Sequence, residues 1–331
     1  MKKFIVFISL LILILSVNLY ADVDKVAQTG IKMLDVGAGA RACGMGEAFT
    51  VIGQDASALF YNPAGIGEIT SNFDLSVGTT QWIADINYIY AAAAYKAGTV
   101  GSFGFSVITS DYGDIIGTRR APENPDGFER TGPVDVGAYC VGVAYAREFT
   151  DKFTVGGQAK YAYQHLGESE VERIGEDFDT LAVKNEVSTM SYDFGLIFYP
   201  GFKSFAFGMS VRNFSPRMKY EQYSFETPLT FALGIGLDLM DFLGDNPDYT
   251  FNIGAEMLHP RDWQEQFHLG GEFGYKDMIF LRLGYKFRYS QEGLNAGVGI
   301  SYGGVRLDYS YSMFDLFDDD IINRVSVGMS F

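Results

Sequence analysis

Apolar and polar residues alternate along most of this chain, and this alternation most constrains what the chain can fold into. The last ten residues, INRVSVGMSF, put Val325, Val327 and Met329 on one side and Arg324 with small residues on the other. Such a period is typical of a β-strand with one apolar face. An apolar strand that ends the chain on an aromatic residue, here Phe331, is common in bacterial outer-membrane barrels.

The same alternation recurs in fourteen segments. We predict strands at residues 73–82, 86–96, 99–109, 134–148, 152–165, 187–199, 203–214, 227–238, 248–257, 264–275, 278–289, 293–302, 304–313 and 322–331. An even number suits a bacterial barrel with both ends on the periplasmic side. The predicted fold class is therefore all-β, a transmembrane antiparallel β-barrel of fourteen strands.

The two faces of the predicted strands differ consistently. In the segment 278–289, Ile279 and Leu281 share one side, and Arg282 and Lys286 share the other. A soluble sandwich would bury the apolar face, whereas a membrane barrel would turn it to lipid. The 28 Phe and 21 Tyr residues favour the barrel, because barrels use aromatic side chains in two interfacial girdles.

The N-terminus indicates export. Lys2 and Lys3 precede an apolar run over residues 4–15, and Ala21 offers a small residue for cleavage. We predict a signal peptide over residues 1–21, because the run is too short to be favoured as a transmembrane helix. We therefore expect this chain in the outer membrane. The net charge of −16 argues against a nucleic-acid partner, and we expect outer-membrane lipid and lipopolysaccharide around the barrel.

Connection lengths agree with this topology. The predicted exterior connections include the long segments 110–133, 166–186 and 215–226, whereas periplasmic ones such as 97–98 are mostly short. The segment 239–247 is an exception, because it is long for a periplasmic turn.

Glycines are frequent on the predicted inner face. A glycine weakens a strand unless another group must approach closely, so we expect an occupied lumen. The expected occupant is the segment that precedes the first strand and lacks alternation. The chain is thus predicted to consist of a signal peptide (1–21), an N-terminal hatch in the lumen (22–72) and a transmembrane barrel (73–331).

The hatch carries the most specific motif, LDVGAGARACGMGEAFTVIGQDASALFYNPAGIGEI. Its glycines permit a close-packed backbone, Asp55 is placed to cap a short helix, and Asn62-Pro63 would end that helix. The motif residues that we single out are Gly37, Gly39, Arg41, Gly44, Gly46, Asp55, Asn62, Pro63 and Gly65.

The run GAGARACGMGEAF followed by DASALFYNPAG resembles the N-terminal signature of the PorV/PorQ family, a branch of the FadL-like outer-membrane proteins. The resemblance covers residues 34–69, and Cys43 departs from it, because small residues such as Ala are usual there. It implies a fourteen-stranded barrel with a hatch in the lumen. It also implies one of two roles, either cargo handling in type IX secretion or movement of hydrophobic molecules across the outer membrane.

Basic residues on the last four predicted strands are expected to face the lumen, namely Arg282, Lys286, Arg288, Arg306 and Arg324. They could hold the carboxylate of a fatty acid, because Arg binds carboxylates with two hydrogen bonds. Alternatively they pair with acids of the wall and hatch, since buried charges are normally paired. The candidate partners are Glu272, Asp308, Asp35, Glu47 and Asp55.

Cys43 in the hatch and Cys140 on the predicted inner face are the only two cysteines. An exported barrel lies in an oxidising compartment. One interpretation is therefore a disulfide between hatch and wall, and the other is a pair of buried thiols.

No arrangement of residues indicates catalysis. The three His residues are scattered, whereas catalytic and metal sites need clustered groups. The acidic run 315–320 lacks the ligand spacing of a calcium loop, and we interpret it as a solvated exterior loop. We expect no enzyme activity, no cofactor and no metal.

We favour a secretion-associated role, in which the exterior connections 110–133 and 166–186 contact secreted cargo proteins or secretion-system components. The alternative is a FadL-like transporter of long-chain fatty acids or other hydrophobic small molecules.

Overall fold

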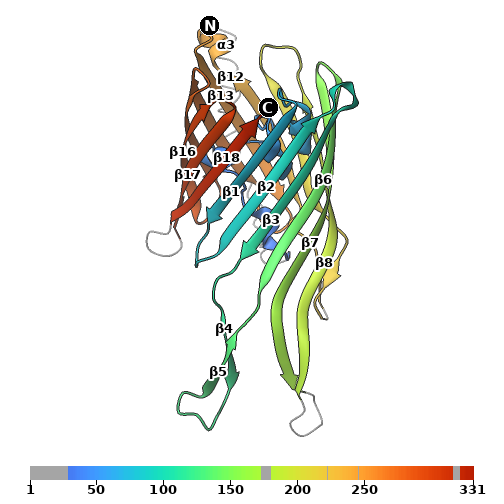
Figure 1. Cartoon of the computed structure of the whole chain (residues 1–331), viewed down its shortest axis with the longest axis vertical. Coiled ribbons are helices and arrows are strands. Elements are labelled where there is room, and N and C mark those ends of the chain that lie inside the picture. Colours follow the sequence, from blue (N-terminus) through green and yellow to red (C-terminus); the bar gives the residue numbers. More distant parts are fainter. Residues whose placement is uncertain (1–28, 173–179, 222, 245, 316–320) are drawn as a thin grey trace.

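The computed structural model describes residues 29–172, 180–221, 223–244, 246–315 and 321–331. Fourteen antiparallel strands close into a barrel (Figure 1), which confirms the predicted fold class and strand number. The predicted signal peptide lies outside the described residues. The barrel strands are β1 (Phe73–Gln81), β2 (Asn87–Lys96), β3 (Ser102–Asp111), β6 (Gly137–Thr150), β7 (Phe153–Glu172), β8 (Thr180–Phe198), β9 (Ala206–Phe214), β12 (Thr230–Asp238), β13 (Tyr249–Pro260), β14 (Gln266–Tyr275), β15 (Ile279–Phe287), β16 (Glu292–Tyr302), β17 (Val305–Phe314) and β18 (Ile321–Ser330).

The C-terminal residue helps to close the barrel. β18 pairs with β1 in antiparallel fashion, with Ser330 opposite Asp74. The Phe331 N–H donates to the Phe73 carbonyl at 2.9 Å, the Phe73 N–H donates back at 3.1 Å, and the two rings stack with centroids 6.4 Å apart. The last residue therefore seals the seam between the first and last strands.

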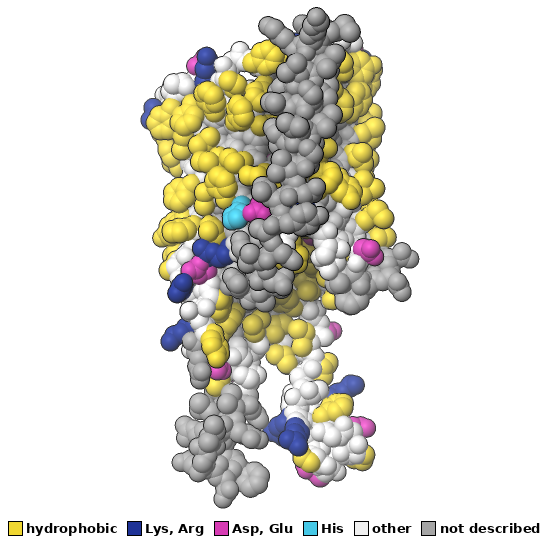
Figure 2. All heavy atoms as spheres, turned by 180° about the vertical axis from the view of Figure 1, so that it is seen from behind, with side chains coloured by type: hydrophobic (Ala, Val, Ile, Leu, Met, Phe, Trp, Pro, Cys, Tyr) yellow, Lys and Arg dark blue, Asp and Glu magenta, His cyan; other side chains and the backbone are white. Residues whose placement is uncertain are grey.

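The outward face of the wall is apolar, as the alternation predicted. In β15, Leu281 and Leu283 are 55% and 61% exposed, whereas Arg282 and Lys286 are 4% and 5% exposed. Figure 2 shows hydrophobic side chains covering the barrel, with most charged side chains toward its ends and on the projecting strands. This distribution suits a wall surrounded by lipid.

The end of the barrel opposite the C-terminus carries long extensions (Figure 1). The predicted connection 110–133 contains a hairpin of β4 (Ile116–Arg120) and β5 (Phe128–Pro133), and β7 and β8 also continue beyond the rim. A smaller hairpin pairs β10 (Met218–Lys219) with β11 (Ser224–Phe225). We take this end as the exterior, since outer-membrane barrels carry their long connections there.

Short helices lie in the connections and before β1. The periplasmic connections hold η4 (Gly98–Val100) and α3 (Met240–Leu243), and α3 accounts for the length of the segment 239–247. Among the described residues, no helix is long and apolar enough to cross a membrane. The helices before β1 are η1 (Lys32–Asp35), α2 (Ala40–Gly44), η2 (Ala56–Phe60) and η3 (Pro63–Gly67).

Residues 29–72, which we call the plug, run through the lumen. The Gly30 N–H donates to the carbonyl of Glu226 at 3.0 Å, in the exterior connection that carries β10 and β11. The chain then passes to the opposite end, where β1 begins. Met33, Met45 and Phe49 are at most 1% exposed, so the plug supplies the core of the molecule.

Wall glycines make room for the plug. A Cβ atom at Gly270 or Gly284 would overlap the backbone of Met45 or Gly46. The absence of a side chain lets the two backbones approach directly, which is the close approach that the glycine-rich inner face indicated. Other wall glycines that face the plug at close range are Gly208, Gly234, Gly236, Gly254 and Gly297.

Candidate functional site

Six charged side chains form a closed ring between the plug and three wall strands, which we call the plug–wall charge ring. The plug supplies Arg41 from α2 and Asp55 from the N-terminus of η2. The wall supplies Glu272 from β14, Arg282 from β15, and Arg306 and Asp308 from β17. Three cations and three anions alternate, so the ring is electrically neutral.

Each member of the ring contacts two opposite charges. Arg41 lies 2.8 Å from both Asp55 and Glu272. Arg282 lies 2.6 Å from Glu272 and 2.8 Å from Asp308. Arg306 closes the ring at 2.9 Å from Asp55 and 2.8 Å from Asp308.

The ring keeps its buried plug carboxylate ionised. Burial raises the pKa of the Asp55 carboxyl, but the charges of Arg306 and Arg41 outweigh burial and hold this pKa well below its usual range. Asp55 also accepts the Ser57 N–H at 3.0 Å and so caps η2, as predicted. One carboxylate therefore serves both the helix cap and the contact with the wall.

Arg282 and Arg306 therefore pair with acids of the wall and plug, which was one of the two interpretations of these basic residues. The structure brings both residues together with Glu272, Asp308 and Asp55. Removing one partner of a buried pair leaves an uncompensated charge. A fatty-acid carboxylate would have to displace one of these partners.

Lys286 and Arg324 also point inward, as predicted. The Lys286 Nζ lies 2.6 Å from the carboxylates of both Glu47 and Glu292. Burial raises the pKa of Glu47, but Lys286, with smaller contributions from His268 and Arg324, outweighs burial and the pKa falls to about 2. Arg324 donates to the Ser312 hydroxyl at 2.7 Å, and its guanidinium lies 5.8 Å from the Trp82 ring centroid.

The prediction for Arg288 is wrong, because this residue does not face the lumen. β15 ends at Phe287, and Arg288 has a φ of 65°, which breaks the alternation of faces. Its exposed side chain lies 4.0 Å from Glu265 and 5.7 Å from the centroid of the Phe267 ring. The prediction placed this turn residue inside the strand 278–289.

Asn62 and Pro63 dock the plug on the wall. The Asn62 side chain donates to the carbonyls of Thr50 at 2.7 Å and Leu196 at 3.2 Å, and accepts the Ala64 N–H at 3.1 Å. Pro63 begins η3, where its missing N–H costs nothing. Wall glycines Gly156 and Gly195 lie against this turn.

The plug glycines serve tight turns and close contacts. Gly39, with a φ of 88°, precedes α2, and Gly46 has a φ of 61°. Both values favour glycine. A Cβ atom at Gly37 would collide with Glu47, one at Gly65 with Gly53, and one at Gly44 would press on Gly297.

The two cysteines are not bridged. Cys43 and Cys140 are free, buried thiols, so the disulfide interpretation is wrong for this structure. The Cys43 sulfur lies 3.6 Å from the Tyr61 hydroxyl, and burial raises the pKa of Cys43 to about 11. Cys140 packs instead in an apolar cluster of the wall with Ile108 and Ala162.

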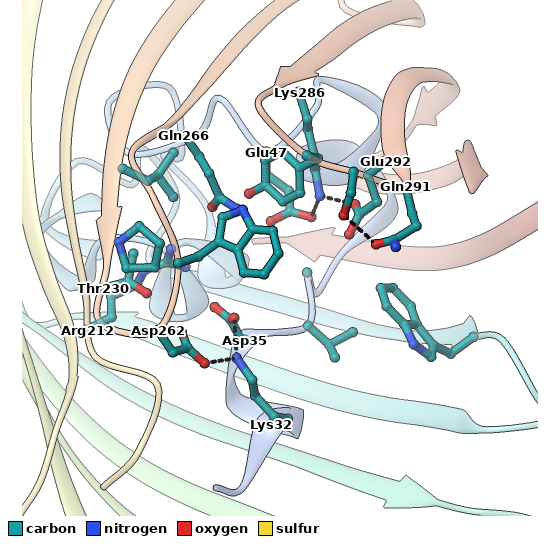
Figure 3. A pocket seen from close by; sticks show the side chains of 18 of the residues that line it. Lys32, Asp35, Glu47, Arg212, Thr230, Asp262, Gln266, Lys286, Gln291 and Glu292 are labelled. Atoms are coloured by element: carbon teal, nitrogen blue, oxygen red, sulfur yellow. Dashed lines mark hydrogen bonds and ion pairs between the residues drawn. The ribbon is translucent and has the colours of Figure 1, made fainter. Parts of the chain in front are cut away.

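A cavity of about 390 Å³, which we call the exterior cavity, lies between the plug and the exterior ends of the strands. Figure 3 shows two ion-paired groups across it. In one, Lys32 lies 3.4 Å from Asp35 and 2.6 Å from Asp262. In the other, Lys286 lies between Glu47 and Glu292. Sequence reasoning missed Lys32 in η1, Asp262 after β13 and Glu292 at the start of β16, because no motif marks these positions.

No metal centre is evident. Across residues 29–172, 180–221, 223–244, 246–315 and 321–331, no group of three or more His, Cys, Asp or Glu side chains is placed to hold a metal ion. The acidic run 315–320 lies almost wholly outside these ranges.

Known structures show where this fold recurs. The toluene transporter TodX of Pseudomonas putida is similar with a TM-score of 0.59 and 11% identity, covering 89% of this chain and 97% of TodX. A FadL homologue of Pseudomonas aeruginosa is similar with a TM-score of 0.54 and 12% identity, covering 89% of this chain and 98% of that protein. At such low identity these likenesses establish the fold alone.

Sequence comparison establishes the family. None of the curated proteins compared with this chain matches it. The family described as "Type IX secretion system membrane protein PorP/SprF" matches residues 129–314, which is more than half of the chain. The match begins beyond the plug motif at residues 34–69, and it names PorP/SprF, not PorV/PorQ. Together with the barrel, it places the chain in the outer membrane, and the chain belongs to the PorP/SprF family of type IX secretion system membrane proteins.

Proposed function

We propose that this chain is a plugged barrel that serves type IX secretion by holding secreted cargo or other secretion components at its exterior extensions. The observation that carries the proposal is a filled lumen combined with strands that project beyond the rim. The charge ring and the glycine contacts fix the plug to β7–β9 and β12–β17. The surface that remains accessible to a partner protein is then that of the exterior extensions.

The β4–β5 hairpin is the best candidate for that surface. It forms a two-stranded sheet outside the barrel, so its edges remain available for strand addition by a partner. Ile115, Ile116 and Phe128 are 44%, 50% and 42% exposed on it. Beyond the membrane, apolar side chains on a free sheet edge favour a protein partner over water.

A finer version of the proposal concerns the step served. The resemblance of residues 34–69 to the PorV/PorQ signature supports a role in receiving exported cargo and passing it on for surface attachment. The proposal includes export by a cleaved signal peptide and assigns the chain no enzymatic activity.

Loop replacement tests the proposal. Residues 117–132 are replaced by a short Gly-Ser linker, and surface-attached cargo that shares a C-terminal sorting domain is quantified in cells. We expect a loss of at least about tenfold, because each lost contact of about 1.4 kcal/mol lowers affinity tenfold. The matched control shortens the β10–β11 hairpin and leaves attachment normal. Normal attachment in the folded β4–β5 variant would refute the proposal.

Hydrophobic transport is the second candidate. Likeness to the toluene transporter TodX supports it, as does an apolar groove of about 610 Å³ on the lipid-facing wall around Gly271, lined by Phe251, Leu269 and Leu283. The exterior cavity, by contrast, is lined by ion pairs, which disfavour an alkyl chain. Uptake of labelled decanoate that depends on this chain in cells would favour transport.

A further inference from the structure

The exterior cavity belongs neither to the charge ring nor to the hairpin surface. Its barrel-side walls come from the exterior ends of strands and their connections, and its floor comes from η1 and neighbouring plug residues. Its volume of about 390 Å³ falls at the small end of ligand pockets, which span about 300–1,000 Å³. The size therefore fits a compact ligand and not a long chain.

Aromatic side chains are concentrated in this cavity. Trp82 and Trp263, the only two tryptophans of the chain, line it together with Tyr88 and Tyr289. Trp82 packs edge-on against Tyr88 at 6.2 Å, and the Trp263 N–H donates to the Arg288 carbonyl at 3.4 Å. Both indoles are half-buried, so each is held in place while part of it remains accessible.

The charged groups of the cavity already have partners: Arg212 donates to the carbonyl of Phe60 at 3.0 Å, and the two lysines meet carboxylates. Lys32 and Lys286 each lie between two carboxylates, and the two groups face each other across the cavity (Figure 3). Gln266 and Gln291 add amide groups to the lining. Such a wall offers fixed hydrogen-bond donors and acceptors.

Three ligand classes can be compared on these observations. An alkyl chain would exclude water from the ion pairs. The paired groups would lose the hydrogen bonds that they make to water, and the alkyl chain offers none in return, which is unfavourable. A free cation or anion would compete with a partner already held 2.6 Å away. A ring that carries hydroxyl groups can both donate to and accept from the walls, and its apolar face can stack on an aromatic side chain.

We propose that the exterior cavity binds a neutral saccharide, in the form of a mono- or disaccharide unit. The half-buried faces of Trp82 and Trp263 stack against the sugar ring. The amides and paired carboxylates hydrogen-bond to its hydroxyls. A site built to pair with hydroxyl groups discriminates strongly against analogues that lack them.

Intrinsic fluorescence tests this directly, because all tryptophan emission of this chain comes from the cavity. The full chain is purified in a detergent without a sugar headgroup and titrated with glucose, galactose, mannose, N-acetylglucosamine, maltose and lactose. We expect a saturable change in emission with at least one sugar. Methyl glycosides form a second arm. If they bind too, the site accepts the end of an attached glycan, and if they do not, it takes the free sugar.

Two variants give the control. Trp263→Ala should weaken binding at least tenfold, as measured by calorimetry, and Tyr223→Ala should not change it. Tyr223 is 88% exposed on the exterior side and does not line the cavity. Heat-dependent gel mobility verifies folding, and Trp263→Leu replaces Trp263→Ala if the latter misfolds.

Three results would each overturn the assignment. One is the absence of a saturable response to any sugar of the panel up to about 100 mM, beyond the range of even weak specific binding. Another is unchanged sugar affinity in a folded Trp263 variant. The third is a saturable response to decanoate or to arginine amide in place of the sugars.

Discussion

At the scale of residues, charge pairing neutralises Arg282 and Arg306, two inward-facing basic side chains of the last strands. The Arg282 side chain is fully buried, and a charge buried to that extent without a partner would cost several kcal/mol. The ring supplies two carboxylates, from β14 and β17, and links them through Arg41 and Asp55 to the plug. The same side chains that neutralise the wall therefore hold the plug.

Removing a plug cation should loosen the plug. In Arg41→Met, Asp55 and Glu272 each lose one of their two cationic partners. We therefore expect the free energy of plug opening to fall by about 3–5 kcal/mol. Hydrogen exchange of residues 40–60, followed by mass spectrometry, measures this. Lys184→Met, which removes an exposed pair with Glu168 on the β7–β8 extension, should change plug exchange by less than about 1 kcal/mol. Equal effects of the two variants would contradict the ring's role.

Acid should loosen the plug within a defined pH window. Glu47 has a pKa lowered from 4.5 to about 2, so the unfolded state binds its proton more readily than the folded state. Its stabilising contribution is complete above pH 4.5 and is lost as the pH falls toward 2. The protection of plug amides, expressed relative to the intrinsic exchange rate at each pH, should therefore fall only below about pH 4.5, and less so in Glu47→Gln. Loss of protection already at pH 6 would contradict the pairing with Lys286.

At the scale of elements, neighbouring glycines of one strand have different tasks. Gly270 of β14 faces the plug, where a Cβ atom would overlap the Met45 backbone. Gly271 faces the lipid side, where a Cβ atom would meet Phe251 at an ordinary 3.4 Å. Gly270 sets the distance between wall and plug, whereas Gly271 lies in the groove of the lipid-facing surface.

This difference predicts a matched pair of variants. Gly270→Ala should displace the plug and make it sensitive to protease, whereas Gly271→Ala should leave it resistant. The physical reason is overpacking, which typically costs about 1–3 kcal/mol. Limited proteolysis of the folded barrel reads out both variants. A resistant plug in Gly270→Ala would show that the wall yields at this position.

Elements could be predicted from the sequence where one face is apolar. The fourteen barrel strands follow from alternation, because the lipid side demands an apolar residue at every second position. The β4–β5 hairpin and the extensions of β7 and β8 stand in water on both faces, so no alternation marks them.

Arg282 and Arg306 could be placed by strand period alone. Arg288 could not, since its positive φ depends on the turn that follows β15. Asp262, a partner of Lys32, lies after β13 and is distant in sequence, which a period does not reveal.

At the scale of the whole molecule, the structure combines a lipid-facing wall, a plug and exterior extensions. The plug fills the lumen, the last residue closes the seam beside Phe73, and the extensions reach away from the membrane on the exterior side. Membership in the PorP/SprF family assigns the molecule to type IX secretion. Under the proposed function, the activity lies on the exterior surface and the lumen has no transport role.

Locking the plug to the wall tests that claim most directly. The Ala40 N–H donates to the Ser326 hydroxyl at 3.2 Å, so a cysteine pair is introduced at these neighbouring positions of α2 and β18, in a background of Cys43→Ala and Cys140→Ala, and its closure is verified by a thiol assay. Surface attachment of cargo is compared in cells that carry the oxidised or the reduced form. We expect equal attachment, because nothing has to pass the plug. Loss of attachment on oxidation, with recovery on reduction, would contradict the account.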